Sequence, residues 1–181
     1  IIYTGIVNDT LKSMINGRNL ISFLADEKVN NENNDITVDG IVNELENYDF
    51  NNICILGYGN LGKRLDKKLK GYNVIFGVKE YSDYCILKRR CFYTCNPNTM
   101  KIVFAESDCI INTVPQNIIT SDMLKGSNAK IIDVSSPPYG ASKEVRETFK
   151  NYGIYPGIPA KYNPSRSGKI LLKKIQKEIG G

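Results

Sequence analysis

Histidine and tryptophan are absent from the 181 residues of this sequence. Histidine is the side chain that most often moves protons in enzymes, so its absence excludes every Ser-His or Cys-His catalytic pair within the chain. Any proton transfer must use Asp, Glu, Lys, Tyr or Cys, or a group from another chain. The sequence therefore identifies no catalytic residue.

Long apolar runs and unbroken basic blocks are also missing. No apolar stretch reaches the ~18 residues that a membrane span needs, and no basic-then-apolar signal segment opens the chain. The formal net charge of +5 comes from 24 basic and 19 acidic residues that are interspersed, which argues against a nucleic-acid-binding arm. We expect a cytoplasmic protein with no membrane or nucleic-acid partner.

Cysteine is scarce, and its number, five, is odd. Cys54 and Cys109 lie in apolar patterns, where a thiol behaves as a small hydrophobe. Cys85, Cys91 and Cys95 lack the spacing of a metal site, and no histidine can complete one. We expect reduced thiols and no metal.

Short runs rich in Ile and Val alternate with amphipathic stretches, a pattern typical of β-α units that feed a parallel sheet. Strands are predicted at residues 52–56, 73–78, 91–94, 108–113, 130–134 and 154–155. Helices are predicted at 35–48, 61–70, 98–105, 142–151 and 165–179, with short turns near Asp83 and Ser121. Asp35, Ser142 and Ser165 are the predicted N-caps.

A polar stretch, 26–34, is predicted to be a linker. It divides the end of an N-terminal lobe (1–34) from the main domain (35–164). Because the chain begins without Met, at what reads as the end of a strand, we expect a further N-terminal region upstream. The stretch 156–164 is rich in Pro and Gly, which predicts an irregular segment at the mouth of a cleft or a hinge.

The last segment, 165–181, is predicted to be a helix that packs back on the N-terminal lobe. Its apolar residues share one face and its lysines the other. The apolar residues are Ile170, Leu171, Ile175 and Ile179.

The most informative motif is the loop Gly57-Tyr58-Gly59-Asn60-Leu61-Gly62, between an apolar strand and an amphipathic helix. Gly57 permits a tight turn, Gly59 lets a pyrophosphate approach the backbone, and Gly62 lets the helix pack closely on the strand. The N–H groups of the helix start then face the phosphates. The motif predicts an α/β fold with a doubly wound parallel Rossmann sheet that binds a dinucleotide. The alternative, that the glycines only shape a tight turn in a fold without a ligand, stays open.

The second strand bears on which dinucleotide binds. It ends Phe76-Gly77-Val78-Lys79-Glu80. NAD enzymes usually place an acid at this strand end, whereas NADP enzymes need space and a cation. Gly77 and Lys79 favour NADP, but Glu80 could bind the ribose of NAD, and that alternative stays open.

Two further strands end in small polar residues and proline. Ligands bind beyond the carboxyl ends of strands in such sheets. The predicted walls for the nicotinamide side are Thr113, Val114 and Pro115 after one strand, and Ser135, Ser136 and Pro137 after the other. Asp133, within the second motif, is also a predicted cofactor-binding residue. The alternative is that both walls are simple strand-ending turns.

Taken in order, these motifs resemble the A subunit of bacterial dipicolinate synthase, from about residue 3 to the last helix. The similarity rests on Ile36-Thr37-Val38-Asp39-Gly40, the glycine loop, Gly77-Val78-Lys79, Ile111-Asn112-Thr113-Val114-Pro115, Ile132-Asp133-Val134-Ser135-Ser136-Pro137 and Pro156-Gly157-Ile158-Pro159. The chain departs from the family at Tyr162-Asn163-Pro164-Ser165-Arg166-Ser167, where a run rich in Ala, Gly and Thr is usual.

The resemblance implies a Rossmann domain after an N-terminal lobe, NADP or NADPH as cofactor, and a second, flavoprotein-like subunit as partner. It implies oxidation of a hydroxytetrahydrodipicolinate, after loss of water, to pyridine-2,6-dicarboxylate during sporulation. Lys79 stands where an arginine is common in the family, which supports NADP.

A dicarboxylate substrate would suit cations, and Lys161 and Arg166 are candidates to bind it. The alternative is that both are solvated cations at helix ends. A non-catalytic dinucleotide-binding subunit or sensor and another NADP-dependent reductase also stay open as functions, as does homo-oligomerisation.

Overall fold

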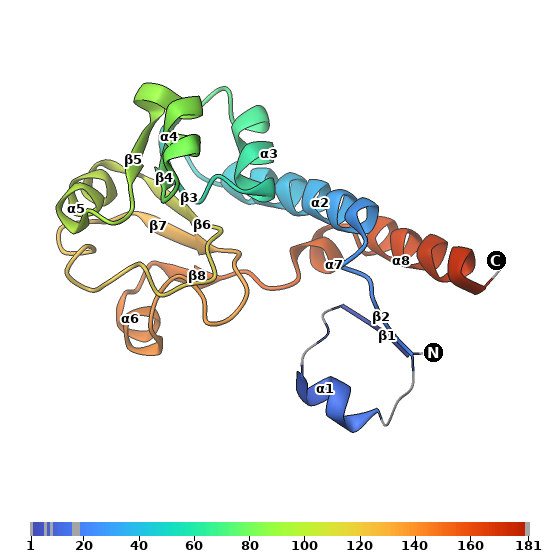
Figure 1. Cartoon of the computed structure of the whole chain (residues 1–181). Coiled ribbons are helices and arrows are strands. Elements are labelled where there is room, and N and C mark those ends of the chain that lie inside the picture. Colours follow the sequence, from blue (N-terminus) through green and yellow to red (C-terminus); the bar gives the residue numbers. More distant parts are fainter. Residues whose placement is uncertain (1, 6, 8, 16–18, 180–181) are drawn as a thin grey trace.

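A six-stranded, all-parallel sheet forms the centre of the computed structural model, which describes residues 2–5, 7, 9–15 and 19–179 (Figure 1). Its strands are β3 (Asn52–Leu56), β4 (Asn73–Val78), β5 (Cys91–Tyr93), β6 (Cys109–Asn112), β7 (Lys130–Asp133) and β8 (Tyr152–Ile154). Their order, β5-β4-β3-β6-β7-β8, is that of a doubly wound dinucleotide-binding sheet, in which the direction of winding reverses between β3 and β6. The predicted fold class is confirmed.

The sheet is covered on both faces because its apolar side chains alternate along each strand. Ile53 and Ile55 of β3 pack on one face, and Cys54 and Leu56 pack on the other. Helices α2 (Glu27–Leu45), α3 (Asn60–Lys68), α4 (Tyr81–Leu87) and α7 (Ile158–Tyr162) contribute to the first cluster, and α5 (Pro97–Glu106) and α6 (Lys143–Thr148) to the second. A short 3₁₀ turn, η1 (Lys88–Arg90), precedes β5.

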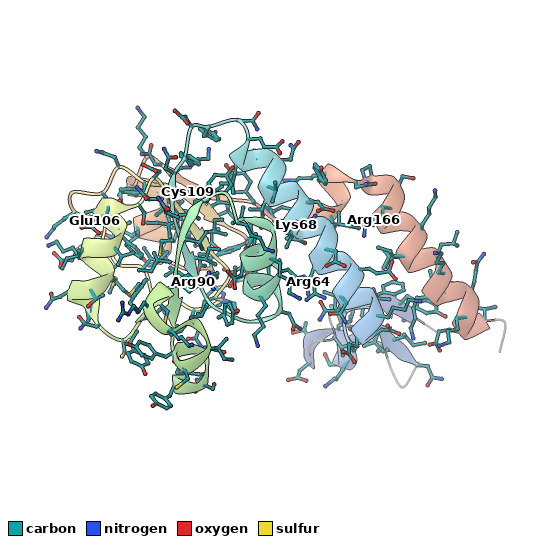
Figure 2. The ribbon with its side chains drawn as sticks, turned by 90° about the horizontal axis from the view of Figure 1, so that it is seen from above. Arg64, Lys68, Arg90, Glu106, Cys109 and Arg166 are labelled. Atoms are coloured by element: carbon teal, nitrogen blue, oxygen red, sulfur yellow. The ribbon has the colours of Figure 1, made fainter. Side chains whose placement is uncertain are left out.

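The N-terminal strands form a separate, smaller unit. Strands β1 (Ile2–Thr4) and β2 (Leu20–Ser22) pair in parallel, with α1 (Asp9–Met14) between them in the chain. The last helix, α8 (Pro164–Ile179), runs along α2 (Figures 1 and 2). The expected return of this helix is confirmed, because Ile170 of α8 packs with residues of the N-terminal region and α2. The cluster consists of Phe23, Val29, Ile36 and Ile170, with Tyr3 and Ile175 against it.

The predicted linker 26–34 is wrong. Helix α2 begins at Glu27, and the side chain of Asp26 accepts a hydrogen bond from Val29 N at 3.1 Å. Asp26, not Asp35, is therefore the N-cap. Because α2 runs through residues 34 and 35, the predicted domain boundary falls inside a helix, and the division of the chain into domains stays a prediction.

Other predictions of local structure had mixed outcomes. Ser142 is confirmed as the N-cap of α6, since it accepts from Val145 N. Ser165 is wrong, because it lies inside α8, and Asn163 Oδ1 accepts from Arg166 N at 3.0 Å instead. The prediction that 156–164 is irregular is also wrong, because α7 forms there, with proline in the first turn, where its missing N–H leaves no gap.

Candidate functional site

The glycine loop has the geometry that its sequence predicts. Gly57 has φ of +98°, and a Cβ there would lie 2.5 Å from Thr113 Oγ1. A Cβ at Gly62 would lie 2.2 Å from the carbonyl oxygen of Gly57, so α3 packs directly on the turn. A Cβ at Gly59 would meet no atom within 4 Å. The outer glycines are thus needed for close packing, whereas the middle one borders open space.

Helix α3 begins at this open space. Gly59 is its N-cap and provides no side-chain hydrogen bond, and the first turn carries no acid. The N–H groups at the helix start are thus left without a side-chain acceptor, which is the arrangement that binds a phosphate. A pyrophosphate fits the loop on the evidence of its space and its donors.

The start of α3 is held in place by Arg64 (Figure 2). Its guanidinium donates to the carbonyl oxygen of Asn60 at 3.1 Å, to Asp35 Oδ1 at 2.8 Å and to Asn31 Oδ1 at 2.7 Å. The first turn of α3 is therefore anchored to α2. The side chain of Leu61, next along the loop, lines a cleft described below.

Tyr58 supports the loop from the side of α3. Its hydroxyl donates to Asp66 Oδ2 at 3.1 Å, and its ring packs edge-on against Phe76, with 5.0 Å between centroids. Arg90 donates to the same carboxylate at 2.7 Å, and this contact holds the pKa of Asp66 below its usual value. Burial raises the pKa of Tyr58. Both the hydroxyl and the ring of Tyr58 therefore contact other residues of the protein.

The predicted walls at the strand ends lie together. Thr113 Oγ1 donates to the carbonyl oxygen of Leu56 at 2.8 Å, and Val114 N donates to Asn112 Oδ1 at 3.2 Å. Thr113 and Val114 both face Gly57, since both would contact a Cβ there. Pro115, the next residue, is exposed. Contact of these residues with a cofactor stays a prediction.

Asp133 is the centre of a buried hydrogen-bond network. Its Oδ1 accepts from Asn112 Nδ2 at 2.9 Å and from Ser135 Oγ at 2.7 Å, and its Oδ2 accepts from Gly140 N at 2.8 Å and from the hydroxyl of Tyr152. Burial, followed by the bond to Asp133, raises the pKa of Tyr152, which keeps the phenol a donor. Asp133 is fully buried and both its oxygens have partners, so it holds the ends of β6 and β7 together. Its contact with a cofactor stays a prediction.

Sequence reasoning missed three members of this network as site residues: Asn112, Gly140 and Tyr152. One signal could have found Asn112: it is a polar residue at the end of an apolar strand, and parallel pairing places it directly beside Asp133. Gly140 has a matching constraint, since a Cβ there would lie 2.4 Å from Asn112 Nδ2.

Lys79 and Glu80 follow β4 at the same edge of the sheet and are exposed. Within the described part of the chain, neither side chain makes a hydrogen bond or ion pair. The space attributed to Gly77 is not available to a ligand, because its missing side chain faces Leu56, Thr94 and Phe92. Gly77 is thus needed for packing, and only Lys79 still supports NADP.

A cleft of about 660 Å³ lies beside the loop, between the sheet and the N-terminal region. Its walls come from α2, α8, the N-terminal strand, the loops after β7 and β8, and Leu61. A larger cavity of about 1080 Å³ lies at the amino ends of β3 and β4. Because sheets of this kind bind ligands beyond the carboxyl ends of their strands, we place the site in the smaller cleft.

Lys161 and Arg166, the candidates for binding a dicarboxylate, are not brought to this cleft. Arg166 Nη1 lies 3.4 Å from Asp39 Oδ2 (Figure 2). Lys161 borders a different cavity, which Glu44 also lines. In the described residues no group of three or more His, Cys, Asp or Glu side chains could hold a metal.

All five cysteines are free. Cys54 and Cys109 are buried in the sheet, and burial raises the pKa of Cys109 to about 12. Across residues 2–5, 7, 9–15 and 19–179, no helix has the length and apolar content of a membrane span.

Solved structures with this fold include the A subunit of dipicolinate synthase. The chain from Bacillus halodurans has a TM-score of 0.84 at 22% identity, and the match covers 99% of this chain and 66% of that one. The corresponding chain from Bacillus subtilis has a TM-score of 0.82 at 23% identity, with 98% and 64% covered. A transhydrogenase from Sinorhizobium meliloti has a TM-score of 0.65 at 11% identity, with 88% and 60% covered.

The predicted resemblance to the dipicolinate synthase A subunit is confirmed as a structural likeness, which at these identities shows the fold. This chain spans about two thirds of the length of those two proteins. No family model matches the sequence, and no curated protein matches it.

Proposed function

We propose that this chain binds NADP(H) and serves an oxidoreductase of the dipicolinate synthase type, in the role of its A subunit, which forms pyridine-2,6-dicarboxylate. The observation that carries the proposal is the open space at Gly59, in front of helix-start N–H groups that have no side-chain acceptor. The proposal extends to a cytoplasmic enzyme of sporulation that works beside a flavoprotein-like second subunit.

Each part of the loop has a separate task in this proposal. Gly57 and Gly62 set the turn, the N–H groups of Asn60 and Leu61 bind phosphate oxygens, and Lys79 binds a ribose 2′-phosphate. When bound, the cofactor supplies a nicotinamide ring that takes up a hydride. Thr113 and its neighbours then form the wall beside that ring.

The chemistry of the substrate side is an aromatisation. Loss of water from hydroxytetrahydrodipicolinate gives a dihydropyridine dicarboxylate, and conversion of this ring to a pyridine removes one hydride and one proton. The proton leaves to solvent or to a group of the partner subunit. The chain contributes the cleft beside Leu61, which orients the ring and excludes water.

Calorimetric titration with NADPH and NADH tests the dinucleotide part. Lys79→Ala should weaken NADPH by about one to two decades, because a charge-assisted contact is lost, and should leave NADH nearly unchanged. The loss should shrink as salt is raised. Equal effects of Lys79→Ala on both cofactors would remove Lys79 from the site.

Gly59→Val should abolish binding of both cofactors in a folded protein, because the side chain would fill the pyrophosphate space.

If Glu80 binds the ribose of NAD instead, the wild-type chain should prefer NADH. Glu80→Ala would then be the damaging change, and Lys79→Ala the harmless one. The same pair of titrations therefore distinguishes NADP from NAD.

A second function, a dinucleotide-binding subunit without catalysis, is favoured by one observation. The residues that line the cleft, among those described, include no Asp, Glu, Lys or Arg, and the chain has no histidine. Formation of pyridine-2,6-dicarboxylate, followed by ultraviolet absorbance with and without the second subunit, separates the two. We expect little activity from this chain alone, and robust turnover by it would refute the non-catalytic alternative.

A further inference from the structure

Half of one edge of the six-stranded sheet is open. Strand β4 has six residues, but its outer neighbour β5 pairs only with the last three, 76–78. In the described part of the chain, no strand lies on this side of residues 73–75. Sheet edges are usually protected by a charge, a proline or a bulge on the strand itself. The open half of β4 carries the apolar residues Val74 and Ile75 instead, so another strand can pair with it.

The backbone of Val74 has a donor and an acceptor that face this opening. Alternate residues of a parallel strand bond to opposite neighbours. The carbonyl oxygen of Gly77 accepts from Gly57, on the β3 side, whereas that of Val78 accepts from Thr94, on the β5 side. Val74 alternates in step with Val78, so its N–H and C=O point toward the β5 side. Within residues 2–5, 7, 9–15 and 19–179, neither group has a hydrogen-bond partner there.

The opening lies in the cavity of about 1080 Å³ at the amino ends of β3 and β4, which we call the edge groove. Its lining includes Tyr72, Val74, Ile75 and Val103, and each of these residues is partly exposed. Because side chains alternate across a strand, Val74 packs on the α3 side of the sheet and Ile75 packs on the α5 side. The edge groove therefore offers apolar surface on both faces of the sheet.

The two sides of the edge groove differ in charge. Lys67 and Lys70 line the α3 side, both are exposed, and neither forms an ion pair among the residues that the structure describes. Arg90 lies 2.7 Å from Asp66 on this side, so that pair adds no net charge. Glu106, also exposed, lines the α5 side. A strand in the edge groove thus meets two available cations on one face and an acid on the other.

We propose that the edge groove binds an extended segment of another protein, which pairs with β4 as an added strand. Its acidic side chains face α3, where the lysines attract them, and its apolar side chains face α5, where Glu106 repels acids. Main-chain bonds to Val74 give such a complex affinity, and the alternating side chains give it specificity. The inference is independent of the proposed function, because the edge groove and the glycine loop lie at opposite ends of the strands.

Fluorescence anisotropy with a fluorescein-labelled peptide, Glu-Val-Glu-Val-Glu amide, tests this inference. The pattern of the probe reads the same in both chain directions, so it suits a parallel or an antiparallel strand. It should bind saturably, with Kd below about 1 mM. Glu-Glu-Val-Val-Glu amide, which has the same composition without the alternation, should bind at least about tenfold more weakly. Equal affinity would mean that the edge groove attracts anions without strand pairing, and it overturns the inference.

Charge reversal tests the α3 side. Lys67→Glu/Lys70→Glu should weaken the acidic probe at least about tenfold, because two attractions become repulsions, and it should bind Lys-Val-Lys-Val-Lys amide more tightly than the wild type does. Lys63→Glu/Lys150→Glu is the matched control, since both lysines are exposed and lie outside the edge groove. It changes the net charge equally and should alter the affinity less than about twofold. If the control loses as much, the attraction comes from net charge alone and the inference is overturned.

Val74→Pro tests the main-chain bonds. Proline is tolerated at a sheet edge where the N–H faces outward, so circular dichroism should show a folded protein, and the probe should bind at least about fivefold more weakly. A probe that is N-methylated at its central residues lacks the donors for the carbonyl oxygen of Val74. It should bind the wild type equally weakly, and it decides the question if Val74→Pro fails to fold. Unchanged binding in either experiment, or no saturable binding of the original probe up to about 1 mM, overturns the inference.

Discussion

Two large clusters of buried side chains flank the six-stranded sheet, whereas the N-terminal strands, the start of α2 and α8 share one small cluster. The glycine loop, which is the dinucleotide half of the candidate site, belongs to the region around the six-stranded sheet, the first region. The Asn-lined wall of the cleft, to which Asn30, Asn33 and Asn34 of α2 contribute, belongs to the second region, which consists of the N-terminal strands, the start of α2 and α8. In the first, binding geometry comes from glycine backbone and a buried polar network. In the second region, the binding geometry comes from polar side chains of α2 that are not members of the apolar cluster.

This difference separates the effects of substitution. A change at Gly57 or Gly62, or beside Asp133, alters the packing on which the geometry of the site depends, whereas Gly59 borders open space and its replacement should alter binding alone. A change at Asn33 alters the surface of a cavity and leaves Val29 and Ile36 packed as before. We therefore expect substitutions in the first region to change mainly the free energy of unfolding. Substitutions on the α2 wall of the second region should change mainly the ligand selectivity.

Truncation of one buried isoleucine in each region tests most directly whether the two regions differ in packing. Ile132 of β7 is fully buried, and Ile170 of α8 retains 7% exposure in a cluster of four. Ile132→Ala should lower the free energy of unfolding by about 4 kcal/mol, and Ile170→Ala by about 2 kcal/mol, because the smaller cluster can collapse around the gap. Urea titration followed by circular dichroism measures both. Equal losses would mean that the two regions are packed equally well.

The network around Asp133 should give the next largest effect. Asp133→Asn places an NH₂ group among N–H and O–H donors and should cost about 3 kcal/mol of unfolding free energy. Tyr152→Phe removes a single donor and should cost about 1 kcal/mol. Asp122→Asn, at an exposed ion pair with Lys125, is the control and should leave the urea midpoint unchanged. An unchanged free energy of unfolding in Asp133→Asn would mean that the fold does not depend on this carboxylate, and it would favour a role for Asp133 in ligand binding.

Within the first region, the two glycines Gly59 and Gly62 of the loop should differ in the stability that they lose on substitution. Gly62→Ala should cost about 2 kcal/mol, because its Cβ would lie 2.2 Å from a carbonyl oxygen. Gly59→Ala should cost less than about 1 kcal/mol, because its Cβ meets nothing. Thermal unfolding of both variants checks the order, and the reverse order would contradict the assignment of open space to Gly59.

The sheet and the loop could be predicted from the sequence because their signals are local. The limits of β3 and β4 agree with the apolar runs, and each glycine of the loop acts through neighbours a few residues away or on the adjoining strand. The wall formed by α2 could not be predicted. Polar residues that face a cavity look in a sequence like residues that face water, so Asn30 to Asn34 resembled a linker.

Contacts between distant segments were the other limit. Asp133 was predicted to bind the cofactor, and that stays a prediction. Its partners in the fold include Gly140 and Tyr152, which no spacing rule connects to it. Arg166 looked available for a carboxylate, yet it pairs with Asp39, 127 residues away. Long-range pairing of polar groups is fixed by the packing of the sheet and helices, and a single sequence does not display it.

The smallest expected effect concerns the ion pair that supports Tyr58. Hydrogen bonding from Arg90 holds the pKa of Asp66 below its ordinary value of 3.8, against the opposing effect of burial. Because the folded pKa is the lower one, the stabilisation is complete above pH 3.8 and is lost as pH falls through the folded pKa. The side chain of Arg90 is 53% exposed, so Asp66→Asn should cost about 1 kcal/mol or less at pH 7. In urea titrations at a series of pH values, the wild type and Asp66→Asn should converge below pH 3.8. A difference that persists unchanged into acid would mean that the ionised carboxylate of Asp66 and its pairing with Arg90 are not the source of the stabilisation.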